Sequence, residues 1–163
     1  MEQQEGAPAP DPRGSGVDIG PMAVEHLPAV LDLGHRVYET SALPYTSWSL
    51  TAAAGHLDSP RSSCRVALSG TRVVGFVLGS MGFEHRDDWG YMEWIAVDPG
   101  LRGHGIAGRL VRECCAGLEA LGASRILTDV ETGNTASLAL MRGSGFSENT
   151  TVMYLERRVG PER

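Results

Sequence analysis

The sequence has few cysteines, no long apolar run and no excess of basic residues, and each shortage excludes a class of protein. Its three cysteines, Cys64, Cys114 and Cys115, are an odd number with two adjacent, which does not fit a disulfide framework. No CxxC or His/Cys spacing indicates a zinc site. No apolar stretch approaches the ~18 residues of a membrane span, and no signal-peptide pattern opens the chain. We therefore expect a reduced, cytoplasmic protein without a metal and without a membrane partner.

The formal net charge of -6 argues against a nucleic-acid partner, because neutralisation of phosphates dominates that kind of affinity. A mildly acidic surface leaves room for a cationic small molecule or a peptide amine. The chain has 163 residues, which suits one domain with a real hydrophobic core. The oligomeric state is left open, a homodimer included.

The first 16 residues are rich in Pro, Gly, Gln and Glu and hold almost no large apolar side chain. Such a segment buries too little surface to offset its chain entropy, so we expect a disordered tail at residues 1–16. A single domain is then expected over residues 17–159, and residues 160–163 form a short C-terminal tail.

Apolar periodicity and turn residues divide the domain into strands and helices. The predicted strands are residues 17–22, 64–68, 73–82, 91–97 and 125–131, with a last pair from Gly145 to near Val159. The predicted helices are residues 23–40, 47–57, 106–121 and 136–142. This order favours an α/β fold in which one mixed sheet of six or seven strands is flanked on both faces by about four helices.

The segment Ile95-Ala-Val-Asp-Pro-Gly-Leu-Arg-Gly-His-Gly-Ile-Ala107 runs from a strand through a glycine-rich turn into a helix. The first helical N–H groups lack internal partners and the helix dipole adds positive charge, so such a junction binds anions. Gly103 and Gly105 let backbone amides approach a phosphate closely. The Gly-Lys-Ser/Thr ending of a Walker loop is missing and a Rossmann fingerprint does not fit, so the alternative is a plain glycine-rich turn.

Two motifs together carry a family resemblance. Arg-x-x-Gly-x-Ala at residues 102–107, preceded by Val-x-Pro, resembles the pyrophosphate loop of the GNAT superfamily of N-acetyltransferases. Asn134-Thr-Ala-Ser-Leu-Ala-Leu-Met-Arg-Gly-Ser-Gly-Phe146 resembles the later motif of the same family, in which an Asn opens a helix that ends in Gly-Phe. The resemblance implies a mostly antiparallel GNAT-like sheet, acetyl-CoA as cosubstrate, and transfer of its acetyl group to a primary amine.

The resemblance also implies roles for individual residues. Backbone groups of Ile95, Ala96 and Val97 would pair with the pantetheine arm of the cofactor like an added strand. Asn134 would bind the pantetheine or a later part of the cofactor. Met141 falls where the family often has an acidic Tyr beside the CoA sulfur, and methionine cannot donate a proton. The pyrophosphate would bind the amides of Arg102, Gly103, His104, Gly105, Ile106 and Ala107.

Acyl transfer to an amine needs a proton acceptor, and Glu93 is the candidate. It is a charged residue inside an apolar strand, and similar GNAT enzymes carry a Glu there; the alternative is a Glu on a solvated sheet face. Strand alternation places it on one face with Tyr91 and Ile95 unless a bulge intervenes. Asp129 is a candidate second carboxylate. Tyr154 or a water is the candidate donor to the CoA thiolate, since Met141 cannot serve.

Aromatic residues border the acceptor site in this family and are equally suited to a core. They are Tyr38, Tyr45, Trp48, Phe83 and Trp89. Two functions remain open at this stage. The first is an N-acetyltransferase that acts on a small-molecule or peptide amine. The second is a non-catalytic acyl-CoA-binding regulatory or scaffold module, which the methionine at position 141 keeps in view. The identity of the acceptor amine is not encoded in any motif.

Overall fold

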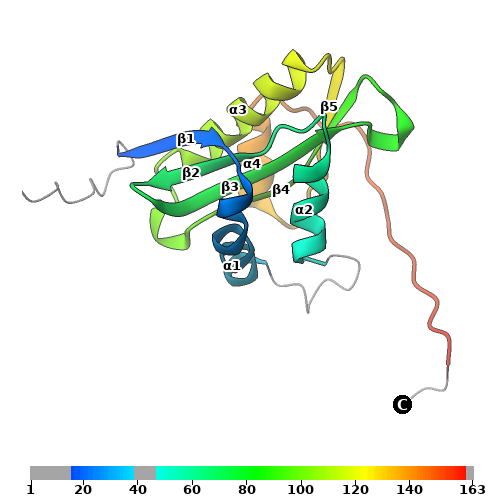
Figure 1. The fold of residues 1–163 in the computed structure, drawn as a ribbon. Coiled ribbons are helices and arrows are strands. Elements are labelled where there is room, and N and C mark those ends of the chain that lie inside the picture. Colours follow the sequence, from blue (N-terminus) through cyan, green and yellow to red (C-terminus); the bar gives the residue numbers. More distant parts are fainter. Residues whose placement is uncertain (1–15, 39–46, 161–163) are drawn as a thin grey trace, which may run out of the picture.

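One five-stranded sheet organises the computed structural model, which describes residues 16–38 and 47–160. The strands are β1 (Val17–Pro21), β2 (Arg65–Ser69), β3 (Arg72–Met81), β4 (Trp89–Val97) and β5 (Arg125–Leu127), in that spatial order. The first four pair antiparallel, and β5 runs parallel to β4 (Figure 1). Apart from Gly16 and Gly160, both expected tails lie outside the described residues.

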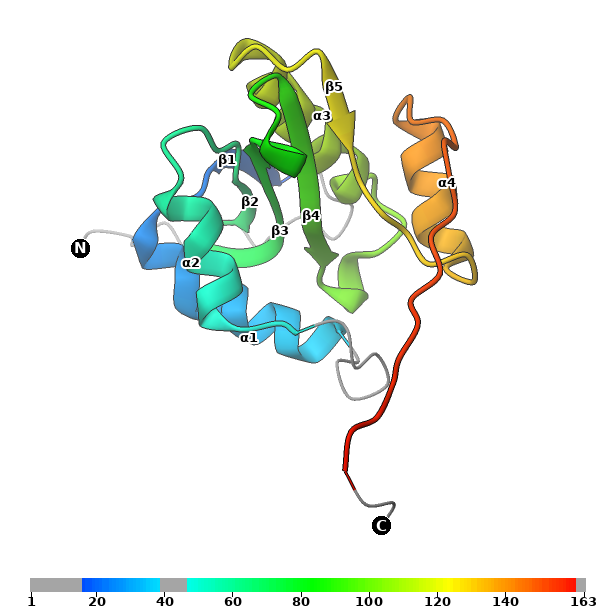
Figure 2. The ribbon, with the colours of Figure 1, turned by 90° about the vertical axis from the view of Figure 1, so that its right-hand side faces the viewer.

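Helices cover both faces of the sheet, as the element order predicts. The described residues form four α-helices: α1 (Leu27–Val37), α2 (Leu50–Asp58), α3 (Ile106–Ala120) and α4 (Thr135–Gly143). Three short 3-10 turns also occur in the described residues: η1 (Val24–His26) precedes α1, η2 (Phe83–His85) lies between β3 and β4, and η3 (Pro99–Leu101) lies between β4 and α3. Helices α1 and α2 lie on one face, and α3 and α4 on the other (Figures 1 and 2). None of the helices described is long and apolar enough to cross a membrane.

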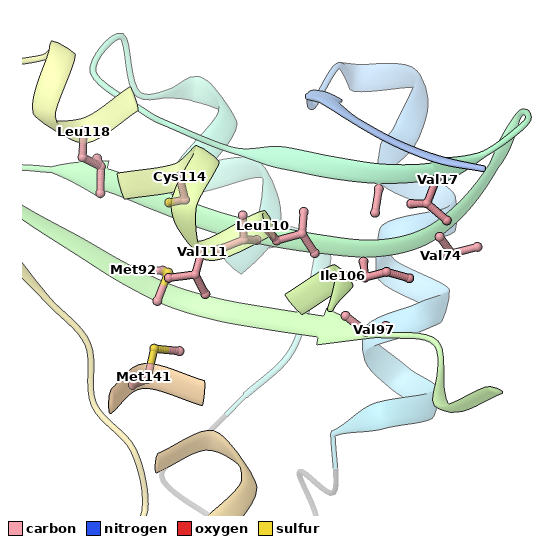
Figure 3. Close-up of a cluster of buried hydrophobic side chains, with 12 residues drawn as sticks. Val17, Val74, Met92, Val97, Ile106, Leu110, Val111, Cys114, Leu118 and Met141 are labelled. Carbon is pink, nitrogen blue, oxygen red and sulfur yellow. The ribbon is translucent and has the colours of Figure 1, made fainter. Parts of the chain in front are cut away.

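Each face of the sheet has its own hydrophobic cluster. The cluster under α3 is aliphatic: Leu110, Val111 and Cys114 of the helix point towards the sheet residues Val74 and Met92 (Figure 3). This is the apolar helical stripe that the sequence predicts, because positions three and four apart share one helix face. The cluster under α1 and α2 is instead built largely from Val30, Leu33, Trp48, Phe76 and Trp94.

The aromatic residues on the α1/α2 face belong to the core. Trp48 stacks on Phe76 with ring centroids 5.2 Å apart, and Tyr38 packs against Trp94 at 4.9 Å. The remaining candidates are elsewhere: Phe83 packs on Tyr91 near the beginning of β4, and the guanidinium of Arg86 lies over the ring of Trp89. Tyr45 lies outside the described residues.

The predicted last pair of strands is wrong for the described part of the chain. The sheet ends at β5, which stops at Leu127 rather than at residue 131, and residues 147–160 carry no strand. Instead this segment leads away from the sheet with Val152, Met153 and Leu155 exposed (Figure 1). Its β-prone composition suggests strands, but β propensity reflects packing against neighbours and is weak when no ladder forms.

Candidate active site

A β-bulge in β4 sets the direction of Glu93. Leu78 pairs with Trp94 and the adjacent Gly79 pairs with Met92, so Glu93 is an extra residue without a partner on β3. Met92 packs into the cluster under α3, whereas Trp94 packs under α1 and α2. The bulge therefore interrupts the alternation, and Ile95 packs with the α3 cluster. Bulges often re-aim a side chain beside an active site.

The carboxylate of Glu93 reaches a cleft of about 320 Å³ between α2 and the sheet. The cleft is lined by Thr51, Ala52, Gly55, His56, Ser80 and Glu93. The side chain of Glu93 is 39% exposed, and its Oε2 lies 2.6 Å from Nε2 of His56. The sequence reasoning missed His56. A signal for it exists, since Ala53 and His56 are three residues apart on the sheet-facing side of α2, where a polar residue is unusual.

The three candidate catalytic residues lie around a second missed residue, Tyr91. Its phenol donates a hydrogen bond to the carboxylate of Asp129. Burial raises the pKa of Tyr91 most, followed by the bond and charge of Asp129 and then by the charges of Glu93 and Tyr154. Tyr91 therefore stays protonated at neutral pH and holds Asp129 near the beginning of β4. Tyr154 itself is 69% exposed.

The edge of β4 that faces β5 is paired only at its beginning. β5 pairs with Trp89, Gly90 and Tyr91, and the following chain then turns away towards α4 (Figure 2). No described strand continues the pairing as far as Ile95, Ala96 and Val97. An extended ligand can add to such an edge through main-chain hydrogen bonds.

The carbonyl of Ile95 already has one side-chain partner at this edge. The phenol of Tyr38 donates to it at 2.7 Å, and burial raises the pKa of that phenol. A carbonyl oxygen has two lone pairs, so a second donor can still bind it. Tyr38 thereby connects the end of α1 to the strand segment that the family resemblance would pair with the pantetheine arm.

The glycine loop ends at the start of α3. Gly103 and Gly105 have φ angles of 82° and 76°, which residues other than glycine rarely adopt. Gly105 is the N-cap of α3, and Arg109 N–H donates back to its carbonyl. The amides of Ile106 and Ala107 consequently have no acceptor within the helix. The buried side chain of Ile106 anchors the turn while those amides remain at the helix end.

Two polar side chains shape the loop. Nδ1 of His104 lies 3.1 Å from the carbonyl oxygens of both Leu101 and Arg102. Because both partners are acceptors, Nδ1 carries the proton and donates a hydrogen bond within the loop. Asp98 accepts from Gly100 N–H at 3.0 Å and pairs with Arg72. The Gly100 hydrogen bond foremost, and the arginine beside it, lower the pKa of Asp98.

The later motif is placed on α4. Asn134 caps this helix, because its Oδ1 accepts from Ser137 N–H at 3.1 Å. Met141 is only 5% exposed and packs into the cluster under α3 near Met92 (Figure 3). Its thioether is thus a core group in this structure. Across residues 16–38 and 47–160, no group of three or more His, Cys, Asp or Glu residues is arranged to hold a metal ion.

Comparison with known proteins extends this picture. Residues 28–146 match the model of the acetyltransferase (GNAT) family. The chain is 34% identical over 104 residues to the N-alpha-acetyltransferase RimI of Mycobacterium tuberculosis (strain ATCC 25618 / H37Rv), a match that spans 61% of each protein.

Solved structures share the fold. The chain matches AAC(6')-Iy in complex with the bisubstrate analog CoA-S-monomethyl-acetylneamine at a TM-score of 0.73 and 21% identity, over 89% of this chain and 100% of that one. It matches the ribosomal-protein-S18-alanine N-acetyltransferase from Escherichia coli at a TM-score of 0.68 and 22% identity, over 82% of this chain and 79% of that one.

Proposed function

Because this chain belongs to the acetyltransferase (GNAT) family, we propose that it transfers the acetyl group of acetyl-CoA to a primary amine of a small molecule or peptide. The observation that carries the proposal is the position of Glu93. The bulge in β4 directs this carboxylate towards a cleft. Glu93 lies two residues before the strand segment whose open edge leads to the glycine loop. Cofactor and proton acceptor are thereby assigned to adjacent parts of one strand.

The cofactor is held mainly by backbone groups in this proposal. The free amides at the start of α3 bind the pyrophosphate, assisted by the helix dipole. The pantetheine arm extends along Ile95, Ala96 and Val97, where β4 has lost its partner β5. This path brings the thioester towards the end of the cleft that contains Glu93.

The chemistry is direct attack. The nitrogen of the amine attacks the thioester carbonyl carbon, the C–N bond forms, and the C–S bond breaks. The surplus proton on nitrogen goes to the carboxylate of Glu93, which then releases it to solvent, and the thiolate of CoA leaves and is protonated from the same solvent. A thiol with a pKa near 8.5 is a tolerable leaving group without an acid, so the buried Met141 does not forbid turnover.

A non-catalytic acyl-CoA-binding module is the second candidate, and Met141 is the observation that favours it. A methionine packed in the core supplies no proton donor near the cofactor. The two functions share the glycine loop and the open strand edge, and they differ in whether the cleft at Glu93 accepts an amine.

A thiol-release assay separates the two functions. Acetyl-CoA is incubated with the protein and a panel of amines: a peptide with a free N-terminus, an N-blocked lysine peptide, a polyamine and an aminoglycoside. We expect acceptor-dependent CoA release and a mass increase of one acetyl group on one class of amine. The chain has no lysine, so self-acetylation at lysine cannot imitate the signal.

Thermal denaturation with acetyl-CoA tests binding separately from turnover. A ligand that binds only the native state stabilises it by about 2.7 kcal/mol at a hundredfold excess over Kd. Stabilisation without acceptor-dependent CoA release would favour the binding module. Neither stabilisation nor release would contradict both candidate functions.

A further inference from the structure

His56 stands behind Glu93 in the cleft. It lies on α2, whose start is fixed by Ser49, since the Ser49 side chain accepts from Ala52 N–H at 3.2 Å. The side chain of His56 is 8% exposed, whereas that of Glu93 is 39% exposed. The imidazole is therefore largely enclosed, and the carboxylate is the more accessible of these two groups that line the cleft.

The geometry of the pair defines where its proton is. Nε2 of His56 and Oε2 of Glu93 are 2.6 Å apart, so one proton lies between them. Nδ1 of the same ring is buried and has no hydrogen-bond partner among the described residues. A buried N–H without an acceptor is costly, so the ring carries its proton on Nε2 and leaves Nδ1 bare. The imidazole is then a donor to Glu93.

The same burial excludes His56 as the base itself. A general base must come within hydrogen-bond reach of the proton that it removes. Nδ1 is enclosed, and Nε2 is occupied by the carboxylate, so neither ring nitrogen meets a substrate in the cleft. Only Glu93 has an oxygen left for that contact.

We propose that His56 is a positioning residue for the acetyl transfer: its Nε2–H holds Oε2 of Glu93 so that Oε1 receives the proton of the attacking amine. The inference rests on the proposed function and adds the group that orients the base. A bulged strand residue with a long side chain has several rotamers, and the bond to a buried ring selects one of them. Misplacement of a reacting group by about 1 Å can reduce a rate about 100-fold.

Two substitutions of similar polarity isolate the role of Nε2. In His56→Gln the amide nitrogen occupies nearly the position of Nε2 and still donates to Glu93. In His56→Asn the shorter side chain places its amide near the position of Nδ1, too far from the carboxylate. We expect His56→Gln to keep kcat within about threefold and His56→Asn to lower it roughly 10- to 100-fold. The Kd for acetyl-CoA should be unchanged in both variants.

The double variant with Glu93→Gln tests whether His56 acts through Glu93. If it does, His56→Asn should add little to the defect of Glu93→Gln, because residues that act as a unit are not additive. Equal rates for the two His56 variants, or a full additional loss in the double variant, would overturn the inference. Melting temperatures of all variants show whether α2 still packs.

A spectroscopic test is independent of turnover. The ¹⁵N shifts and couplings of the His56 side chain should show the tautomer protonated at Nε2, and Glu93→Gln should change its Nε2–H signal. An Nδ1-protonated ring, or one that does not respond to Glu93→Gln, would overturn the pairing even if acetyl transfer is found. Conversely, the expected tautomer in a protein that transfers no acetyl group would contradict the proposed function and with it the catalytic role of His56, leaving only a structural pair.

Discussion

The two sides of β4 offer different kinds of chemical group to a ligand. The side assigned to the cofactor offers main-chain groups: the unpaired strand edge after Tyr91 and the amides at the start of α3. The acceptor side offers side chains: the carboxylate of Glu93, the imidazole behind it and the hydroxyls of Thr51 and Ser80. Main-chain recognition tolerates side-chain changes except where glycine is needed, whereas chemistry by a side chain depends on that one residue.

The largest expected effect is on the acceptor side. Glu93→Gln keeps the shape of the side chain and removes its capacity to accept a proton. Loss of a general base typically reduces a rate roughly 100- to 10,000-fold. We expect this fall in kcat in the thiol-release assay, with an unchanged Kd for acetyl-CoA because the proposal assigns cofactor binding to backbone groups.

A matched control for this variant is Glu113→Gln on the exposed side of α3. It makes the same change in charge at a distance from the cleft and should leave the rate unchanged. The defect of Glu93→Gln should also shrink as the pH rises, since more of the amine is then already neutral. Full activity of Glu93→Gln near neutral pH would make Glu93 an ordinary sheet residue.

On the cofactor side, glycine is the sensitive position. Gly105 has a φ of 76°, so Gly105→Val strains the loop and disturbs the amides that we propose to bind the phosphate. We expect the Kd for CoA to rise at least ~10-fold, which is 1.4 kcal/mol of binding free energy. Isothermal titration calorimetry measures it directly.

Gly70 provides the control for backbone strain. It has a φ of 62° in the turn between β2 and β3, and an added Cβ meets nothing within 4 Å at either glycine. Gly70→Val and Gly105→Val should therefore each lower the free energy of unfolding by about 1–2 kcal/mol, and Gly70→Val should leave the affinity for CoA intact. Equal CoA affinity in the two variants would contradict the assignment of the loop.

A smaller effect is expected at Asp98, which anchors the loop from the end of β4. Asp98→Asn keeps an acceptor for Gly100 N–H and removes the charge that faces Arg72. We expect a loss of about 1.5 kcal/mol in the free energy of unfolding at neutral pH, measured by urea denaturation. The lower end of the range for charged hydrogen bonds applies because the Arg72 side chain is largely exposed.

The pH dependence of this loss has a definite sign. The pKa of Asp98 is lowered in the folded protein, so its contribution is complete above the ordinary pKa of an aspartate, near 4. It disappears as the pH falls through the lowered folded value. The stability difference between wild type and Asp98→Asn should therefore begin to shrink below about pH 4 and reach its minimum below the lowered folded pKa of Asp98. A constant difference down to strongly acidic pH would show that the charge of Asp98 does not carry the effect.

Local signals were sufficient to predict the central part of the fold. Helical periodicity predicts α3 within one residue, and the Ser-Gly-Thr-Arg turn predicts the β2–β3 hairpin. The glycine loop was identifiable because strand, turn and helix are adjacent in the sequence. The prediction of strands after residue 145 was wrong because strand pairing is a long-range property. The composition of this segment favours an extended backbone but does not specify a partner strand.

The candidate site was predictable only in part for the same reason. Glu93 could be selected as a charge inside an apolar strand, but the bulge that aims it depends on a register shift against Gly79. His56 and Tyr91 are 37 and 2 residues away from Glu93 in the chain, and neither belongs to a motif. Their roles arise from packing of α2 on the sheet and from the approach of Asp129, which no local pattern encodes.

The smallest expected effect is at Tyr154, the phenol that the sequence offers as donor to the CoA thiolate. Its side chain is largely exposed on a segment without strand pairing, so water competes at that position. A thiolate of pKa near 8.5 also leaves tolerably without an acid. We expect Tyr154→Phe to change kcat by no more than about twofold at neutral pH, the size of effect that a minor contribution of about 0.4 kcal/mol would give. If the phenol does protonate the thiolate, the loss should instead exceed about tenfold in kcat, leave the Kd for acetyl-CoA unchanged, and fade above about pH 8.5, where the thiolate needs no proton. The pH profiles of kcat for wild type and Tyr154→Phe decide between these outcomes. A loss of more than tenfold would mean that a residue of the unpaired segment after α4 protonates the CoA thiolate.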